Sequence, residues 1–182
     1  VIGVAMTTGA FNWLVQVILN NKFMNGKAWF TVWFVLLFAW FMGCHNSIIM
    51  CVIFCAFANA IFKQVGLEKN HPLIVAMYLG IAYACMMGQI LFPFISTGLT
   101  LVMAYGAMFP NNPIDMVPYL VFMVIVGVAM VTVYVALLKF VFRIDASPIA
   151  TFKTEGGAPP ATREQKMALF IFVLFIIYTS CV

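Results

Sequence analysis

The stretch AWFTVWFVLLFAWFMGCHNSIIMCVIFCAFANAIF, residues 28–62, decides the fold. It contains no Asp, Glu, Lys or Arg, and GCHNS (43–47) is the most polar cluster in any apolar run of the chain. Backbone groups in lipid must pair within their own segment, so such a run is predicted to be helical. Two complete crossings need about 20 residues each plus a turn. The stretch is short for that, so we predict a re-entrant hairpin that turns at GCHNS; the alternative is a tight pair of full helices with GCHNS as their outer loop.

The composition of the whole chain points to the same environment. Of 182 residues, 65% are hydrophobic and 8% are charged, against about 25% charged residues in soluble domains. A soluble fold could not cover so much apolar surface. The apolar runs are continuous, as in 121–138, and lack the alternation of a membrane β-barrel. We therefore predict an all-α integral membrane protein.

Polar breaks divide the chain and predict its orientation. Lys and Arg occur in 20–27, 63–71 and 143–166 but not in FPNNPID, 109–115. Cytoplasmic loops carry an excess of Lys and Arg, so 20–27, 63–71 and 143–166 are expected in the cytoplasm and 109–115 outside. The protein would then be a multi-pass protein of the plasma or inner membrane. The predicted elements are a helix at 1–19, the hairpin at 28–62, a segment at 72–108, a helix at 116–142, a cytoplasmic linker at 143–166 and the start of a further helix at 167–182.

Segment 72–108 is too long for a single helical crossing of the membrane. One continuous helix would be about 55 Å long, nearly twice the hydrocarbon core of about 30 Å, yet the charge rule asks for an odd number of crossings. Pro93, Gly88 and Gly98 disfavour a continuous helix. We predict a broken transmembrane helix; the alternative is two short helices joined near Pro93. Interrupted apolar segments point to a transporter binding site.

LGIAYA (79–84), followed by Gly88, resembles the GIAYA…GG segment of the divalent anion:sodium symporters, the dicarboxylate and citrate carriers of the ion transporter superfamily. The order of hairpin, basic loop and broken helix is also similar, so residues 1–142 would form one of the family's two inverted membrane repeats. The chain departs from the family pattern: His45 replaces Ser, Gln89 replaces the second Gly, ISTG (95–98) stands near the family's GTPP stretch, and Ser47 conservatively replaces Thr.

The resemblance implies a site. The family's hairpin tip, Ser-Asn-Thr, helps to bind sodium and the substrate carboxylate, and it corresponds here to His45, Asn46 and Ser47. Further candidates flank the predicted break: Gly88, Ser96 and Thr97. Na⁺ is the expected coupling ion, a small organic anion the expected substrate, and no cofactor or resident metal is expected.

The same residues have simpler interpretations. His45 can carry a coupling proton or face an anion, or it can be a neutral histidine at a turn. Asn46 and Ser47 can cap the following helix, and Ser96 and Thr97 can bond to their own helix. Asn12 and Gln16, one turn apart, are expected to join helices.

The function expected from the sequence is part of a sodium-coupled symporter of small organic anions, such as dicarboxylates. Both ends lie in apolar runs, so we expect a piece of a longer protein whose second inverted repeat is missing; a homodimer is also possible. The alternatives are a non-transporting membrane subunit or a proton-coupled or inorganic-anion carrier. No catalytic motif indicates an enzyme, no nucleic-acid partner is expected, and the five cysteines in apolar runs are expected to form no disulfide.

Overall fold

The computed structural model describes residues 7–19, 24, 26–68, 70–92, 96–151 and 160–181. Over these residues the chain is all-α, with no strand. The elements are α2 (Ala10–Leu19), α3 (Ala28–Gly43), α4 (Ser47–Val65), α5 (Pro72–Gly88), α6 (Ser96–Met108), α7 (Met116–Ala136) with the π-helical turn η1 (Leu137–Val141), α8 (Ser147–Thr151) and α9 (Arg163–Cys181).

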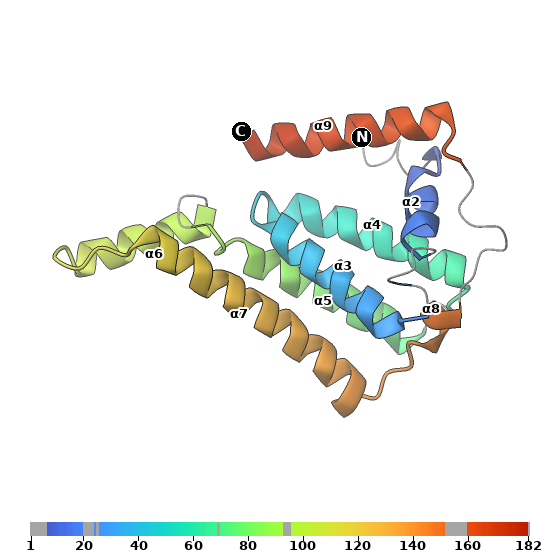
Figure 1. Cartoon of the computed structure of the whole chain (residues 1–182), viewed down its shortest axis with the longest axis horizontal. Helices are drawn as coiled ribbons and strands as arrows, with labels where there is room; N and C mark the ends of the chain where they lie inside the picture. The colour runs from blue at the N-terminus through green and yellow to red at the C-terminus, as the bar shows by residue number, and fades with distance from the viewer. Residues whose placement is uncertain are drawn as a thin grey trace.

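Helices α3, α4 and α5 form the centre of the molecule, and α7 crosses α3 and α5 on one side (Figure 1). Leu36, Met50 and Ile81, one from each central helix, are fully buried. The short helix α2 packs on α4 and against α9 at one end of the bundle. Apolar side chains on the facing sides of three helices therefore make one continuous core.

Local sequence explains where these helices begin and end. The side chains of Asn46, His71 and Asp115 accept hydrogen bonds from backbone N–H groups in the first turns of α4, α5 and α7, which otherwise lack helical partners. Pro72 follows His71 at the first position of α5, where its missing N–H costs nothing. Gly66, with φ +71°, ends α4 in the left-handed conformation that glycine adopts without strain.

The segment 28–62 is two antiparallel helices, α3 and α4, joined by a turn at residues 44–46. Their 16 and 19 residues correspond to about 24 and 28 Å. Two of the described helices, Ser47–Val65 and Met116–Val141, are long and apolar enough to cross a membrane. The segment 72–108 is interrupted between Gly88 and Ser96; Pro93, to which the predicted break was assigned, is outside the described residues.

Several boundaries differ from the predicted ones. The apolar run 1–19 is not one helix as far as it is described, because Gly9 has φ +69° and α2 begins only at Ala10. The predicted linker 143–166 contains α8 and the first residues of α9, which starts at Arg163 rather than at Met167. Thr162 and Gln165 bond to each other's backbone N–H groups across this start, in the manner of a capping box. Capping thus extends the helix into polar sequence that hydropathy assigned to the linker.

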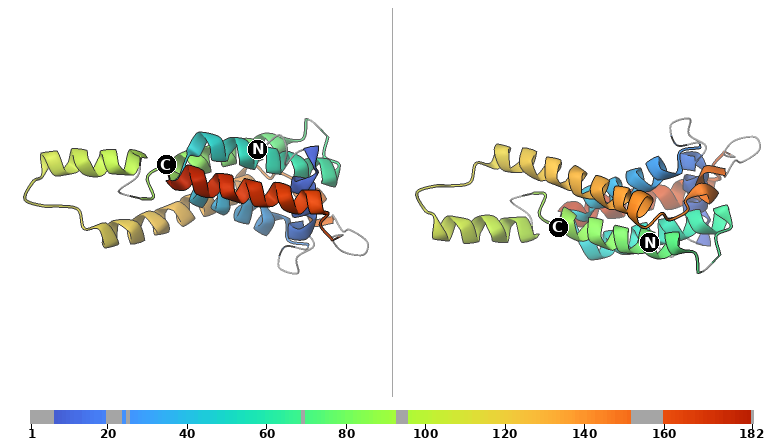
Figure 2. Two further views of the ribbon diagram at one scale, coloured as in Figure 1. Left: turned by 90° about the horizontal axis from the view of Figure 1, so that it is seen from above. Right: turned by 90° about the horizontal axis from the view of Figure 1, so that it is seen from below.

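Helix α6 and the beginning of α7 project beyond the bundle as an arm (Figures 1 and 2). The large apolar side chains along this arm are exposed, for example Met103 at 66% and Phe122 at 59%. Of the α7 residues, only Gly127, Val131 and Val135 are buried. Most of the apolar surface of α6 and α7 is therefore not covered by the described chain.

Gly43 is expected to be intolerant of any side chain. A Cβ at this position would lie 2.5 Å from the backbone oxygen of Cys85, which cannot move without shifting α5. We expect Gly43→Ala to destabilise the protein by about 1–3 kcal/mol through overpacking, seen as a lower midpoint of thermal unfolding in detergent. Gly106→Ala is the matched control, because its Cβ meets nothing within 4 Å and the better helix propensity of Ala stabilises by up to about 1 kcal/mol. A Gly43→Ala protein that melts at or above the wild-type temperature contradicts the close packing.

Candidate functional site

The turn of the α3–α4 hairpin and the interruption after α5 are joined by three polar side chains. The amide nitrogen of Gln89 donates a hydrogen bond to the Ser47 hydroxyl. The hydroxyl of Thr97 donates to the other end of the same amide, with 3.0 Å between Thr97 Oγ1 and Gln89 Oε1. This polar cluster, Ser47–Gln89–Thr97, connects the first residue of α4 with residues on both sides of the interruption.

Glycine allows the two backbones to approach this closely. A Cβ on Gly88 would lie 2.2 Å from the carbonyl oxygen of Trp40, and one on Gly43 would meet the backbone of Cys85. Such separations are far below van der Waals contact, so only hydrogen fits at either position. The ends of α3 and α5 therefore pack backbone to backbone beside the polar cluster.

A tyrosine from α7 donates a hydrogen bond to a backbone carbonyl at the interruption. Tyr119 Oη donates a hydrogen bond to the carbonyl oxygen of Ile90 at 2.6 Å, and the N–H of Leu91 donates one to the carbonyl oxygen of Gly88 at 3.0 Å. A buried backbone group without a partner costs about as much as a lost hydrogen bond. Tyr119 thus stabilises the non-helical backbone and ties α7 to it.

The hairpin turn places its own polar residues differently. Asn46 is exposed, and its Oδ1 accepts a bond from the N–H of Ile49 at 3.1 Å, so it acts as the N-cap of α4. Ser47 is 5% exposed and is the first residue of the helix rather than part of the turn. His45 is half-buried, with Nδ1 3.7 Å from the sulfur of Cys44.

Of the six predicted site residues, the structure brings Ser47, Gly88 and Thr97 together around Gln89, with Asn46 and His45 preceding Ser47 in the adjoining turn. Ser96 begins α6, and its side chain lies outside the described part of the chain. Gln89 was not among the predicted site residues, although a polar side chain in an apolar run is a visible signal. Tyr119 was not among the predicted site residues either, and nothing local in the sequence indicates its bond to Ile90.

The electrostatics of this region come from the backbone. The C-terminal ends of α3 and α5 and the N-terminal ends of α4 and α6 meet here, and helix ends carry partial charges of about half a unit, negative at the C-terminus and positive at the N-terminus. No Asp, Glu, Lys or Arg occurs in 28–62 or 72–108. Such a region can bind a small ion through carbonyl, amide and hydroxyl groups.

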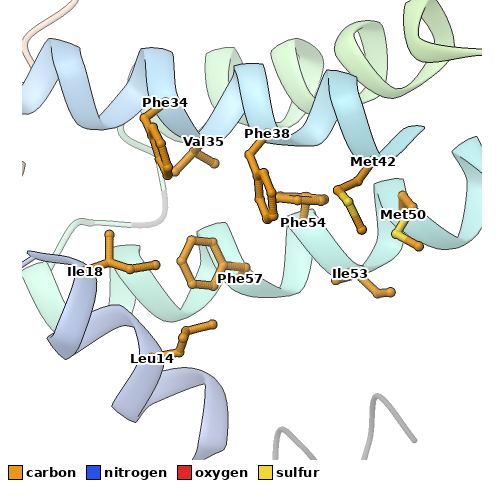
Figure 3. A pocket seen from close by; sticks show the side chains of 10 residues that line it. All are labelled: Leu14, Ile18, Phe34, Val35, Phe38, Met42, Met50, Ile53, Phe54 and Phe57. Atoms are coloured by element: carbon orange, nitrogen blue, oxygen red, sulfur yellow. The ribbon is translucent and has the colours of Figure 1, made fainter. Parts of the chain in front are cut away.

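A separate cavity of about 120 Å³ lies between α2, α3 and α4, and it has a different character. Figure 3 shows ten side chains around it, all of them hydrocarbon or thioether. Met42 and Met50 bring it close to the hairpin turn. A cavity without polar groups suits an apolar group rather than an ion.

Metal-ligand clusters and disulfides are absent from the described residues. No group of three His, Cys, Asp or Glu residues there is arranged to hold a metal. The cysteines Cys44, Cys51, Cys55 and Cys85 are free thiols.

The bond between Ser47 and Gln89 predicts an energetic coupling. We expect the double variant Ser47→Ala/Gln89→Met to be less destabilised than the sum of the single variants, with a coupling of about 0.5–3 kcal/mol, measured by reversible unfolding in mixed micelles. Pairing Ser47→Ala with Thr132→Val, a residue bonded instead to Trp33, is the control and should be additive within about 0.5 kcal/mol. Additive effects of Ser47 and Gln89 would argue against the contact.

Comparisons of the chain with protein-family models, with curated proteins and with solved structures found no match. An all-α fold is compatible with many functions. The arrangement of the polar cluster is therefore the basis for any functional assignment.

Proposed function

We propose that this chain is part of a membrane-embedded secondary transporter, a sodium-coupled symporter of small organic anions such as dicarboxylates. The observation that carries the proposal is the polar cluster Ser47–Gln89–Thr97, which joins a helical hairpin turn to a helix interruption in a region without charged side chains. Two interrupted apolar segments that meet are typical of transporter binding sites.

The membrane part of the proposal is supported by exposed apolar surface. Soluble monomers rarely expose contiguous apolar patches larger than a few hundred Å², whereas α7 exposes Val117, Phe122 and Ile125, each by more than half. An 18-residue window within the span Met116–Val141 also has a mean hydropathy of 2.7. We propose a multi-pass protein of the plasma or inner membrane, with lipid or further protein against α6 and α7.

In the proposed mechanism, Na⁺ binds among uncharged oxygens near the hairpin turn. Hard cations of this kind prefer carbonyl, amide and hydroxyl oxygens, and Asn46, Ser47 and Thr97 supply side-chain oxygens beside the end of α5. A substrate carboxylate would then bind near the N-terminus of α4, where the partial positive charge favours anions. Bound Na⁺ lowers the electrostatic cost of burying the anion, which couples the two binding events.

Alternating access requires the cluster to open and close. Ser47 and Thr97 belong to different helices, and Gln89 connects them. A ligand that replaces these hydrogen bonds with its own contacts changes the relative stability of two arrangements, which is the thermodynamic requirement for a ligand-driven change.

The proposed hairpin is re-entrant, entering and leaving on the cytoplasmic side. Helices of about 24 and 28 Å would reach most of the way across a core of about 30 Å. The hairpin therefore has to be tilted for its turn to lie near the middle of the membrane. The alternative, two full crossings, puts the turn in the outer solvent.

Labelling with a membrane-impermeant maleimide distinguishes these topologies. In a cysteine-free background, Ile48→Cys reports on the turn, because Ile48 is 77% exposed. For a re-entrant hairpin we expect external labelling of Ile48→Cys to be much slower than that of Phe109→Cys in the predicted outer loop, and to change when Na⁺ is added. Glu68→Cys serves as the cytoplasmic control. External labelling of the turn at the Phe109→Cys rate, with or without Na⁺, would establish full crossings.

Transport itself is tested by uptake of labelled succinate and citrate into vesicles that contain the protein in its full natural length, with and without an inward Na⁺ gradient. We expect Na⁺-driven uptake by the wild type and a loss of at least about tenfold in Asn46→Ala and Ser47→Ala, since one lost contact to a charged ligand costs about 1.5–3 kcal/mol.

Asn46→Ser retains an N-cap and separates loss of a ligand from loss of helix stability. Asn12→Ala is the amide control, because its exposed side chain lies on α2. Uptake that responds neither to Na⁺ nor to these substitutions would remove the mechanism.

One observation favours a second candidate, a non-transporting membrane subunit. Ser47, Gln89 and Thr97 bond to one another, and Asn46 bonds to its own helix, as expected for polar residues that hold helices together in lipid. For such a subunit, the substitutions above would lower stability in proportion to the lost bonds, and no gradient-driven uptake would be measured.

A further inference from the structure

A second cavity lies at the opposite end of α3 from the hairpin turn. It has a volume of about 520 Å³ and opens to the surface between the start of α3, the end of η1 and the segment that leads into α8. Its chemistry is mixed, with basic, aromatic and small apolar residues around one space. Its lining includes Lys27, Trp29, Phe30, Lys139, Asp145 and Ser147.

Two lysines from distant parts of the sequence line this cavity. Lys27 immediately precedes α3, and Lys139 lies in η1 at the end of the α7 span. Both are exposed, and neither forms an ion pair with another described residue. The Lys139 ammonium lies 5.1 Å from the centre of the Phe140 ring. Two cationic groups around one opening are an arrangement that suits an anion of phosphate type.

Asp145, the acidic residue among the described lining residues, is held by hydrogen bonds from Ser147. Asp145 Oδ1 accepts from the Ser147 N–H and Oδ2 accepts from the Ser147 hydroxyl, both at 2.9 Å. These bonds, the backbone one first, lower the pKa of Asp145 below its ordinary value, so the carboxylate stays ionised at neutral pH. It therefore opposes an anion and reduces the net charge of the opening from two positive charges to one.

The apolar residues indicate that this anion is attached to hydrocarbon. Trp29 and Phe30 line the cavity with Lys27 at the start of α3, and Phe140 and Val141, which follow Lys139 in η1, are exposed by 68% and 64%. A free phosphate gains nothing from such surroundings. A phospholipid gains from both parts, since its headgroup meets the lysines and its chains meet exposed apolar surface.

We propose that this cavity binds the headgroup of an anionic phospholipid in the cytoplasmic leaflet. The proposal rests on the membrane embedding proposed above but not on transport, and a binding measurement tests it without any uptake assay. Lipid held here connects the start of α3 with the end of the α7 span, the two elements that also pack against each other near Trp40 and Gly127.

The test is native mass spectrometry of the delipidated protein titrated with phosphatidylglycerol or with phosphatidylcholine. We expect selective retention of phosphatidylglycerol by the wild type. A lysine near an anionic lipid contributes about fivefold to affinity, so Lys27→Gln/Lys139→Gln is expected to bind roughly 25-fold more weakly. Asp145→Asn should bind up to about fivefold more tightly, and Lys27→Arg/Lys139→Arg should bind as the wild type does.

The charge-matched control is Lys63→Gln/Arg163→Gln, which removes the same charge from residues that do not line the cavity. Equal weakening in this control would overturn the proposal in favour of general electrostatic attraction. Wild-type binding without selectivity for phosphatidylglycerol, or displacement of it by millimolar inorganic phosphate, would also overturn it. Photocrosslinking of wild-type protein with a headgroup-labelled phosphatidylglycerol gives an answer without substitutions, and the expected labelled peptides contain residues 26–30 or 139–150.

Discussion

The rest of the structure depends on the pairing of polar backbone groups where helices stop inside an apolar body. Each helix end leaves N–H or C=O groups without helical partners, and the hairpin turn and the interruption after Gly88 place such ends close together. The side chain of Asn46 accepts a hydrogen bond from the N–H of Ile49 in the first turn of α4, and the hydroxyl of Tyr119 donates one to the carbonyl of Ile90. Without these partners, N–H groups of α4 and the carbonyl of Ile90 would be left unpaired, which costs free energy where water is excluded.

The glycine positions follow from the same requirement. For the short side chains of Ser47 and Thr97 to reach one amide, the ends of α3 and α5 have to come closer than ordinary helix packing allows. Gly43 and Gly88 make that distance possible, and Gly127 does the same for α7, where a Cβ would overlap the Trp40 ring. Small residues at helix contacts and polar groups between helices are thus two parts of one packing solution.

The sequence was informative about the fold where apolar runs and polar interruptions coincide. The hairpin turn was predicted from the polarity of GCHNS, and the interruption of 72–108 from its excess length and from Pro93, Gly88 and Gly98. The bend at Gly9 and the early start of α9 were not predicted, because each depends on a local conformation that hydropathy does not report. In the candidate site, Ser47 was expected from the resemblance and Thr97 from its place beside the predicted break, whereas Tyr119 contacts a residue that only the tertiary fold brings near it.

The amide of Gln89 points its nitrogen at Ser47 and its oxygen at Thr97, and both partners are hydroxyls that could pair with the reversed amide as well. A hydroxyl can both donate and accept a hydrogen bond, and hydroxyls stand on both sides of this amide. If the side chain turns over, Ser47 becomes the donor and Thr97 the acceptor, and the same three residues remain connected. The dipole of the Gln89 amide can thus be reversed while the same three residues remain connected. The local electric field can then adjust to either sign of charge while the helices stay in place.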